Sequence, residues 1–176
     1  DWSSDVCSSD LYGAVVVPIL HEFKADQVHN IVNHSEARLL FVGDQIWENL
    51  NEAAMPHLEG IIELKDFGVP VSRSEKLAYA RDHLNEIFGH KFPCRFRPDD
   101  ISYEKEKSED LAIINYTSGT TGYSKGVMLP YRSILSNVLY CKEKIGLKAG
   151  DSVVSMLPLG HVFGMTFDFL YGFTAG

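Results

Sequence analysis

The sequence is short of cysteine and of positive charge, and both shortages exclude kinds of site. Its 176 residues include three widely spaced cysteines, Cys7, Cys94 and Cys141. No C-x-x-C pair occurs, so neither a zinc site nor a disulfide framework is indicated, and reduced thiols in the cytoplasm are expected. Lysine and arginine number 16 against 24 aspartates and glutamates, a net charge of −8. A nucleic-acid surface needs clustered positive charge, so no nucleic-acid partner is expected.

Long apolar runs are also lacking. No segment reaches the roughly 18 apolar residues that a membrane-spanning helix needs. The apolar stretch that begins at Val162 is interrupted by Asp168 and is expected to be a buried helix. We therefore expect no transmembrane segment, and peripheral association with a membrane stays open.

What the sequence does contain is an alternation of strand-like and helix-like segments. Short β-branched or apolar runs predict strands at 15–19, 39–42, 61–64 and 152–156. Amphipathic runs predict helices that begin at Asp26, at Gln45 and at Ser74, and a fourth helix that is capped by Ser133. The helix from Ser74 is expected to reach Phe88. The last of these helices would turn four residues inward: Ile134, Val138, Cys141 and Ile145. This alternation is typical of an α/β fold around a mainly parallel sheet.

The segment from Tyr116 to Gly126 carries most of the chemical information. It combines serine and threonine hydroxyls with three glycines and one lysine. Hydroxyls donate hydrogen bonds to anionic oxygens, glycines let the backbone approach a ligand closely, and a lysine supplies a point charge for phosphate. The segment is not a Walker A motif, because Gly126 follows Lys125 where that motif needs serine or threonine. It therefore predicts a loop around a polyphosphate, with a polar β-hairpin turn as the alternative.

The loop and two further blocks resemble one family. The run from Leu111 to Val127 is similar to the phosphate-loop motif of the adenylate-forming (AMP-binding) superfamily, which comprises acyl-CoA synthetases, luciferases and the adenylation domains of peptide synthetases. The run from Gly13 to Ile19 resembles the family's G-A-x-x-V-P block, and the run from Leu157 to Gly164 resembles its P-L-x-H-x-x-G block. The resemblance is closest to long-chain fatty-acid–CoA ligases. Two positions depart from the family pattern: Ser124 stands where proline is usual, and Tyr131 where histidine is common.

The resemblance implies a reaction and a set of site residues. ATP would activate a carboxylic acid, here a fatty acid, to an acyl adenylate, and coenzyme A would then take the acyl group; Mg²⁺ is expected with ATP. Lys125 would act catalytically by neutralising charge on the departing pyrophosphate. His161 would line the acid pocket, or alternatively bond its loop neighbours. The implied phosphate-binding residues are Thr117, Ser118, Gly119, Thr120, Thr121, Gly122, Ser124, Lys125 and Gly126. Ligands for the metal ion are not assigned.

The domain organisation follows the same resemblance. Residues 1–10 are expected to be a non-native or disordered terminus, and residues 11–176 an incomplete portion of the family's large N-terminal domain. Residues 89–110, which carry a dense mixed charge, would form a surface connector. The family's adenine-binding block and catalytic lysine find no counterpart, so the chain alone is expected to be inactive. Two other functions stay open: an adenylation domain of a peptide synthetase, and a non-catalytic phosphate-binding protein.

Overall fold

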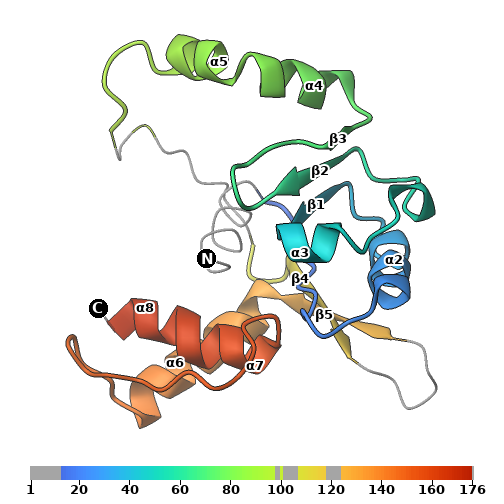
Figure 1. Cartoon of the computed structure of the whole chain (residues 1–176). Helices are drawn as coiled ribbons and strands as arrows, with labels where there is room; N and C mark the ends of the chain where they lie inside the picture. The colour runs from blue at the N-terminus through green and yellow to red at the C-terminus, as the bar shows by residue number, and fades with distance from the viewer. Residues whose placement is uncertain (1–12, 98–99, 101–106, 118–123, 176) are drawn as a thin grey trace. The chain divides into compact units, whose positions relative to one another are not determined.

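A computed structural model of the chain describes residues 13–97, 100, 107–117 and 124–175. The chain divides into two compact units, one made of Asp1–Glu22 with Tyr103–Gly176 and the other of Phe23–Ser102. Each unit combines helices with a small sheet, as Figure 1 shows. The predicted α/β class is therefore confirmed.

The unit Phe23–Ser102 is built on three strands. Strands β1 (Leu39–Val42) and β2 (Gly60–Glu63) pair in parallel, and β2 pairs with β3 (Val71–Ser72) in antiparallel orientation. Its helices are α2 (Ala25–His34), α3 (Asp44–Trp47), the 3₁₀ turn η1 (Glu52–Ala54), α4 (Glu75–Asp82) and α5 (Leu84–Lys91). The helix predicted from Gln45 to Ala54 is thus two short helical turns, with Asn51 capping the second by accepting a hydrogen bond from the Ala53 amide.

Helix α2 confirms the periodicity argument, because Val28, Ile31 and Val32 are all buried. These residues recur at i, i+3 and i+4 and so occupy one face of the helix. A side-chain hydrogen bond connects the helix to the η1 turn: Asn33 Nδ2 donates to the carbonyl of Ala54 at 2.8 Å.

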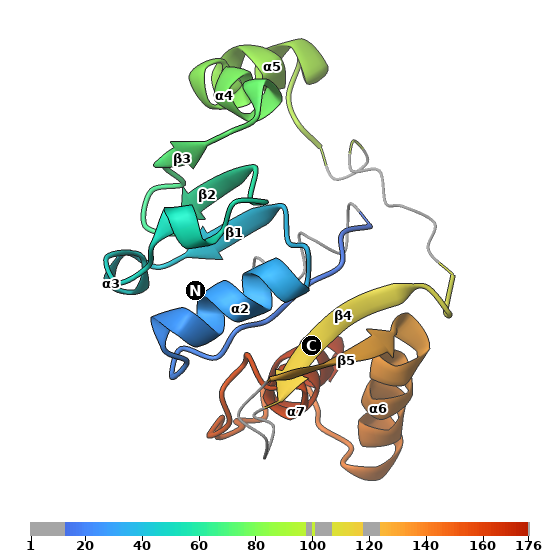
Figure 2. The same cartoon turned by 90° about the vertical axis from the view of Figure 1, so that its right-hand side faces the viewer.

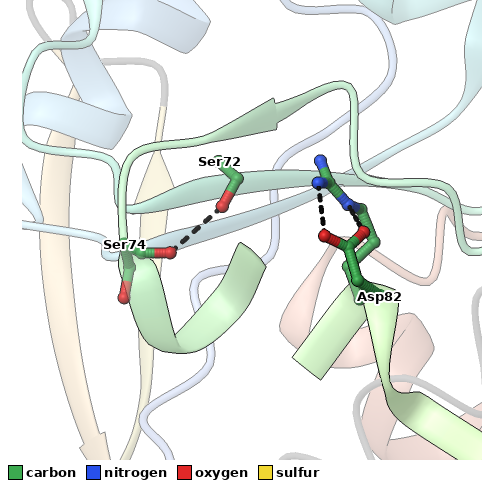
Figure 3. A network of polar contacts seen from close by, with 4 residues as sticks. Ser72, Ser74 and Asp82 are labelled. Atoms are coloured by element: carbon green, nitrogen blue, oxygen red, sulfur yellow. Dashed lines mark hydrogen bonds and ion pairs between the residues drawn. The ribbon is translucent and has the colours of Figure 1, made fainter. Parts of the chain in front are cut away.

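The single helix predicted from Ser74 to Phe88 is two helices instead. His83 has φ −122° and ψ 21°, which ends α4 and starts α5. Asp82 and His83 are weak helix formers, so little opposes a break there. Figure 3 shows the local polar contacts: Ser72 Oγ donates to the Ser74 carbonyl, and Asp82 receives two hydrogen bonds, from Arg81 Nε at 2.7 Å and Nη2 at 3.2 Å. Hydrogen bonding from Arg81 holds the pKa of Asp82 below its ordinary value.

The other unit is built on an antiparallel hairpin. Strand β4 (Leu111–Thr117) pairs with β5 (Lys125–Pro130), and helix α6 (Tyr131–Lys144) packs against both, as Figure 2 shows. Ala112 and Ile113 on β4, Ile134 on α6, and Met165 form a buried apolar cluster. This core packs β4 against α6 and against the helical segment that contains Met165.

Helix α6 was partly mispredicted at its ends. It begins at Tyr131, with Pro130 in the capping position, so Ser133 is not the cap; its carbonyl instead accepts hydrogen bonds from Ser136 and Asn137. Proline fits a helix start because its missing N–H has no intrahelical partner to lose. Ile134, Val138 and Cys141 are buried as predicted, and burial raises the pKa of the Cys141 thiol, but Ile145 is 55% exposed.

A second helical run lies against α6. It consists of α7 (Val162–Gly164), the π-helical stretch η3 (Met165–Tyr171) and α8 (Gly172–Ala175), which are continuous in Figure 1. The buried Tyr171 anchors the preceding loop, because its hydroxyl accepts a hydrogen bond from the Leu147 amide at 2.8 Å. No helix among the described residues is both long and apolar enough to cross a membrane. Peripheral association stays a prediction.

The strand predicted at 152–156 does not form a ladder with any described residue. Its side chains are largely exposed, with Val154 at 80% and Met156 at 84%. The adjacent β-branched residues Val153 and Val154 favour an extended backbone, but a strand also needs a neighbour whose N–H and C=O groups it can bond.

Candidate functional site

The predicted phosphate loop connects the open ends of β4 and β5. Thr117 is the last residue of β4 and Lys125 the first of β5, and the register places them directly opposite each other. Residues directly opposite in an antiparallel pair project from the same face, so the Thr117 hydroxyl and the Lys125 ammonium belong to one face of the hairpin. Both residues are exposed. The intervening predicted ligands lie outside the described residues: Ser118, Gly119, Thr120, Thr121 and Gly122.

Lys125 makes no salt bridge with any carboxylate that the structure describes. Its charge is therefore not neutralised within that part of the chain. Ser124 precedes it at intermediate exposure. A lysine at an open hairpin end, beside hydroxyl groups, can bind an anionic oxygen.

The other face of the hairpin explains Gly126. This glycine lies opposite Tyr116, and a Cβ at its position would sit 3.2 Å from the Tyr116 ring and 3.0 Å from Ile114 Cγ2. Tyr116 is 4% exposed, and burial raises the pKa of its hydroxyl. The ring thus packs within the protein, and the glycine lets it lie close against β5.

Asn115 connects the hairpin to the loop that carries His161. It is 6% exposed, and its Nδ2 donates to the Gly160 carbonyl at 3.3 Å, 45 positions along the chain. Side chains on a strand alternate between faces, so Asn115 shares the face of Thr117. The loop before His161 therefore lies on the face of β4 that bears Thr117. Asn115 was not among the predicted site residues, although an amide in a largely apolar strand is a recognisable signal.

His161 stands at the start of the α7 helix, in the capping position. Its Nδ1 accepts a hydrogen bond from the Phe163 amide at 3.2 Å, its own amide donates to the Pro158 carbonyl at 2.9 Å, and its carbonyl accepts from Met165 at 3.0 Å. Because Nδ1 is an acceptor, the neutral ring carries its proton on Nε2. The side chain is exposed and can present that N–H to a ligand. The structure shows the alternative interpretation, in which His161 bonds its loop neighbours through Nδ1. A place in the acid pocket stays a prediction, and Nε2 is the nitrogen that could donate to the acid.

The family-like block from Gly13 to Ile19 also contacts β4. Of the strand predicted at 15–19, only Val16 forms a bridge, in parallel with Ile113 on β4; its amide donates to Ala112 and its carbonyl accepts from Ile114, both at 2.9 Å. The following residues reach Gly160, where an added Cβ would lie 3.2 Å from Leu20 Cδ2. All three blocks therefore converge on β4.

The arrangement can bind an anion at the hairpin end and offer a neutral donor nearby. No group of three or more His, Cys, Asp or Glu side chains suited to a metal ion occurs in the described part of the chain. The ligands of the expected Mg²⁺ stay unassigned.

Comparisons with known proteins agree with the family resemblance of the three sequence blocks. A family model described as AMP-binding enzyme matches residues 10–176. The chain is 33% identical over 168 residues to the peroxisomal long chain acyl-CoA synthetase 6 of Arabidopsis thaliana. This alignment covers 89% of this chain and 22% of that protein. It is 39% identical over 165 residues to a 4-chlorobenzoate–CoA ligase of an Arthrobacter species. This second alignment covers 90% of this chain and 27% of that protein.

A solved structure shares the fold. The crystal structure of the anthranilate CoA ligase AuaEII in complex with anthranoyl-AMP matches with a TM-score of 0.78 at 21% identity, over 99% of this chain and 32% of that one. The chain thus spans about a quarter of the length of the curated relatives, 22% and 27% for the two above. One of these relatives is a peroxisomal protein by name, so a cytoplasmic location stays a prediction for this chain.

Proposed function

This chain belongs to the family of AMP-binding enzymes, and on that premise we propose that it carries the phosphate-binding and acid-binding residues of an acid–CoA ligase. The observation that supports the proposal most directly is the Asn115–Gly160 hydrogen bond, which puts the His161 loop on the face of β4 that bears Thr117. Lys125 lies opposite Thr117 on that face. Groups suited to phosphate thus share one face of the β4–β5 hairpin with the loop that carries a group suited to a carboxylate.

In the proposed reaction, a carboxylate oxygen attacks the α-phosphorus of ATP. The bond from that phosphorus to the bridging oxygen breaks, and pyrophosphate leaves with the electron pair. The thiolate of coenzyme A then attacks the acyl carbon, and AMP leaves. Such chemistry depends chiefly on positioning and on neutralising charge as it develops. Lys125 and the Thr117 hydroxyl would stabilise the pyrophosphate, and His161 Nε2–H would orient the carboxylate.

Mg²⁺ would reach the site together with the nucleotide. This ion prefers octahedral oxygen ligands and usually keeps several waters while binding substrate phosphates. The hydroxyl-rich hairpin end fits that chemistry, because it does not need to provide a complete set of protein ligands.

The relatives suggest two classes of acid. A long-chain fatty acid is favoured by the name of the Arabidopsis relative, and an aromatic acid by the name of the Arthrobacter relative, which has the higher identity. We propose a fatty acid, because the segment from Leu129 to Ile134 and the His161 block resemble ligases of that type, and we treat an aromatic acid as the second candidate.

Exchange of labelled pyrophosphate into ATP tests the function. The complete polypeptide that carries this sequence would be incubated with ATP, Mg²⁺ and, separately, palmitate, 4-chlorobenzoate or a mixture of amino acids. We expect exchange that depends on palmitate. Exchange with 4-chlorobenzoate alone would select the aromatic class, and exchange with amino acids alone would indicate a peptide-synthetase domain. ATP binding without exchange under any condition would contradict the enzyme and favour a phosphate-binding protein.

Replacing His161 by alanine should weaken use of the acid more than use of ATP. The ring stands on the acid side of the proposed site and its Nδ1 is already occupied by the Phe163 amide. Losing one neutral hydrogen-bond donor is expected to raise the KM for the acid about 5- to 10-fold, while the KM for ATP changes little. Asparagine at this position can keep the helix cap and isolates the effect of the ring. Unchanged KM and kcat for the acid in both variants would show that His161 is structural.

A further inference from the structure

Asn115 is a buried polar residue among the mostly apolar residues of β4. Its neighbours on β4, Ala112, Ile113 and Tyr116, are buried. Asparagine is depleted in strands, and burying an amide is unfavourable unless it is hydrogen-bonded. Tyrosine and cysteine aside, the buried polar side chains among the described residues are those of Asn115 and Thr166. A residue of this kind in the middle of a core strand indicates a specific partner.

That partner fixes the backbone next to His161. Asn115 Nδ2 donates to the Gly160 carbonyl, and Gly160 is bonded directly to His161 in the chain. The His161 backbone is then held on both sides, by Pro158 before it and by Met165 after it. A displacement of Gly160 would therefore be transmitted to the His161 ring rather than absorbed by a loose segment.

In the other direction, Asn115 is two positions from Thr117, about 7 Å along a strand. Thr117 and Lys125 form the last pair of the hairpin ladder, and Asn115 and Val127 form the pair two positions further inside, beyond the Tyr116–Gly126 pair. The amide thus lies between the phosphate end of the hairpin and the histidine loop, and it bonds one to the other.

We propose that Asn115 is a positioning residue for acid activation: through Gly160 it sets where His161 stands relative to Thr117 and Lys125. This inference rests on the proposed function. Asn115 touches neither substrate; it acts by holding the two substrate-binding segments at a fixed separation. In-line attack is sensitive to such alignment, and a shift of about 1 Å can reduce a rate roughly 100-fold.

The test compares Asn115→Leu and Asn115→Asp with the wild type in the pyrophosphate exchange assay. Leucine has a similar size without a donor, and ionised aspartate has nearly the same shape but only accepts. We expect kcat to fall about 10- to 100-fold in both variants while KM for ATP and for the acid change less than about 3-fold, because each substrate keeps its own contacts. Should Asn115→Leu lose its native circular dichroism, the Asp variant, which has nearly the native shape, carries the test.

Asn33→Leu is the matched control. Asn33 also donates its Nδ2 to a distant carbonyl, that of Ala54, but it belongs to the unit Phe23–Ser102 and to no predicted site. Its loss should lower thermal stability and leave kcat unchanged. Wild-type kcat in both Asn115 variants, a loss confined to KM, or an equal loss of kcat in Asn33→Leu would overturn the inference. Absence of acid-dependent exchange in the wild type would refute the proposed function itself, and this inference with it.

Discussion

Replacing Lys125 by alanine is expected to slow acid-dependent ATP–pyrophosphate exchange by about 10- to 1000-fold. That range is typical of removing one preorganised donor from a site where negative charge develops. Lys125 opens β5 directly opposite Thr117, on the face that also bears Asn115 and the His161 loop. The position suits a group that stabilises pyrophosphate as it departs.

The effect should be confined to the first half of the reaction. Pyrophosphate leaves when the adenylate forms and takes no part in thioester formation, so transfer of the acyl group from pre-made acyl adenylate to coenzyme A should proceed at the wild-type rate. Lys125→Arg should recover only part of the exchange rate, because a planar guanidinium fork does not replace the compact point charge of an ammonium group.

Lys142→Ala provides the control for loss of a positive charge. Lys142 is exposed in the last turn of α6 and is no predicted ligand. The Lys142→Ala variant should exchange pyrophosphate at the wild-type rate at low and at high salt. If Lys125→Ala behaves like Lys142→Ala, the lysine does not bind phosphate and the loop assignment fails.

Much of this site could be predicted from local sequence. A hydroxyl-rich, glycine-rich segment predicted a loop around a polyphosphate or, alternatively, a β-hairpin turn, and the observed strands end at Thr117 and resume at Lys125 on either side of it. The chemistry of those residue types is independent of the rest of the fold. The role of His161 as a cap is likewise local, since it depends on the two residues that follow.

The Asn115–Gly160 contact could not be predicted, because its partners are 45 positions apart. A sequence shows that an amide is out of place in a strand, but only the fold shows which carbonyl it meets. The strand predicted at 152–156 failed for a related reason. Strand propensity is a property of the segment, whereas a ladder needs a partner strand that the segment does not contain.

Gly164→Ala is expected to destabilise the 176-residue chain by about 3 kcal/mol, or roughly a 100-fold shift of the folding equilibrium. Gly164 is buried and helical, with φ −59° and ψ −44°, so alanine would suit its backbone. The obstacle is space. A Cβ there would lie 2.6 Å from the Pro158 carbonyl oxygen and 3.1 Å from that of Leu157. These are backbone atoms of the loop before His161, so relief requires α7 and that loop to separate.

Gly172→Ala separates this steric effect from helix propensity. Gly172 has nearly the same backbone angles, φ −55° and ψ −44°, and a Cβ there would meet nothing within 4 Å. Alanine should therefore leave stability unchanged or raise it by up to about 1 kcal/mol. Urea unfolding followed by circular dichroism gives both values, provided that the variants share one m value. Equal midpoints for Gly164→Ala and Gly172→Ala would mean that the Leu157–Pro158 backbone does not press against α7, and the described placement of the His161 loop would be wrong.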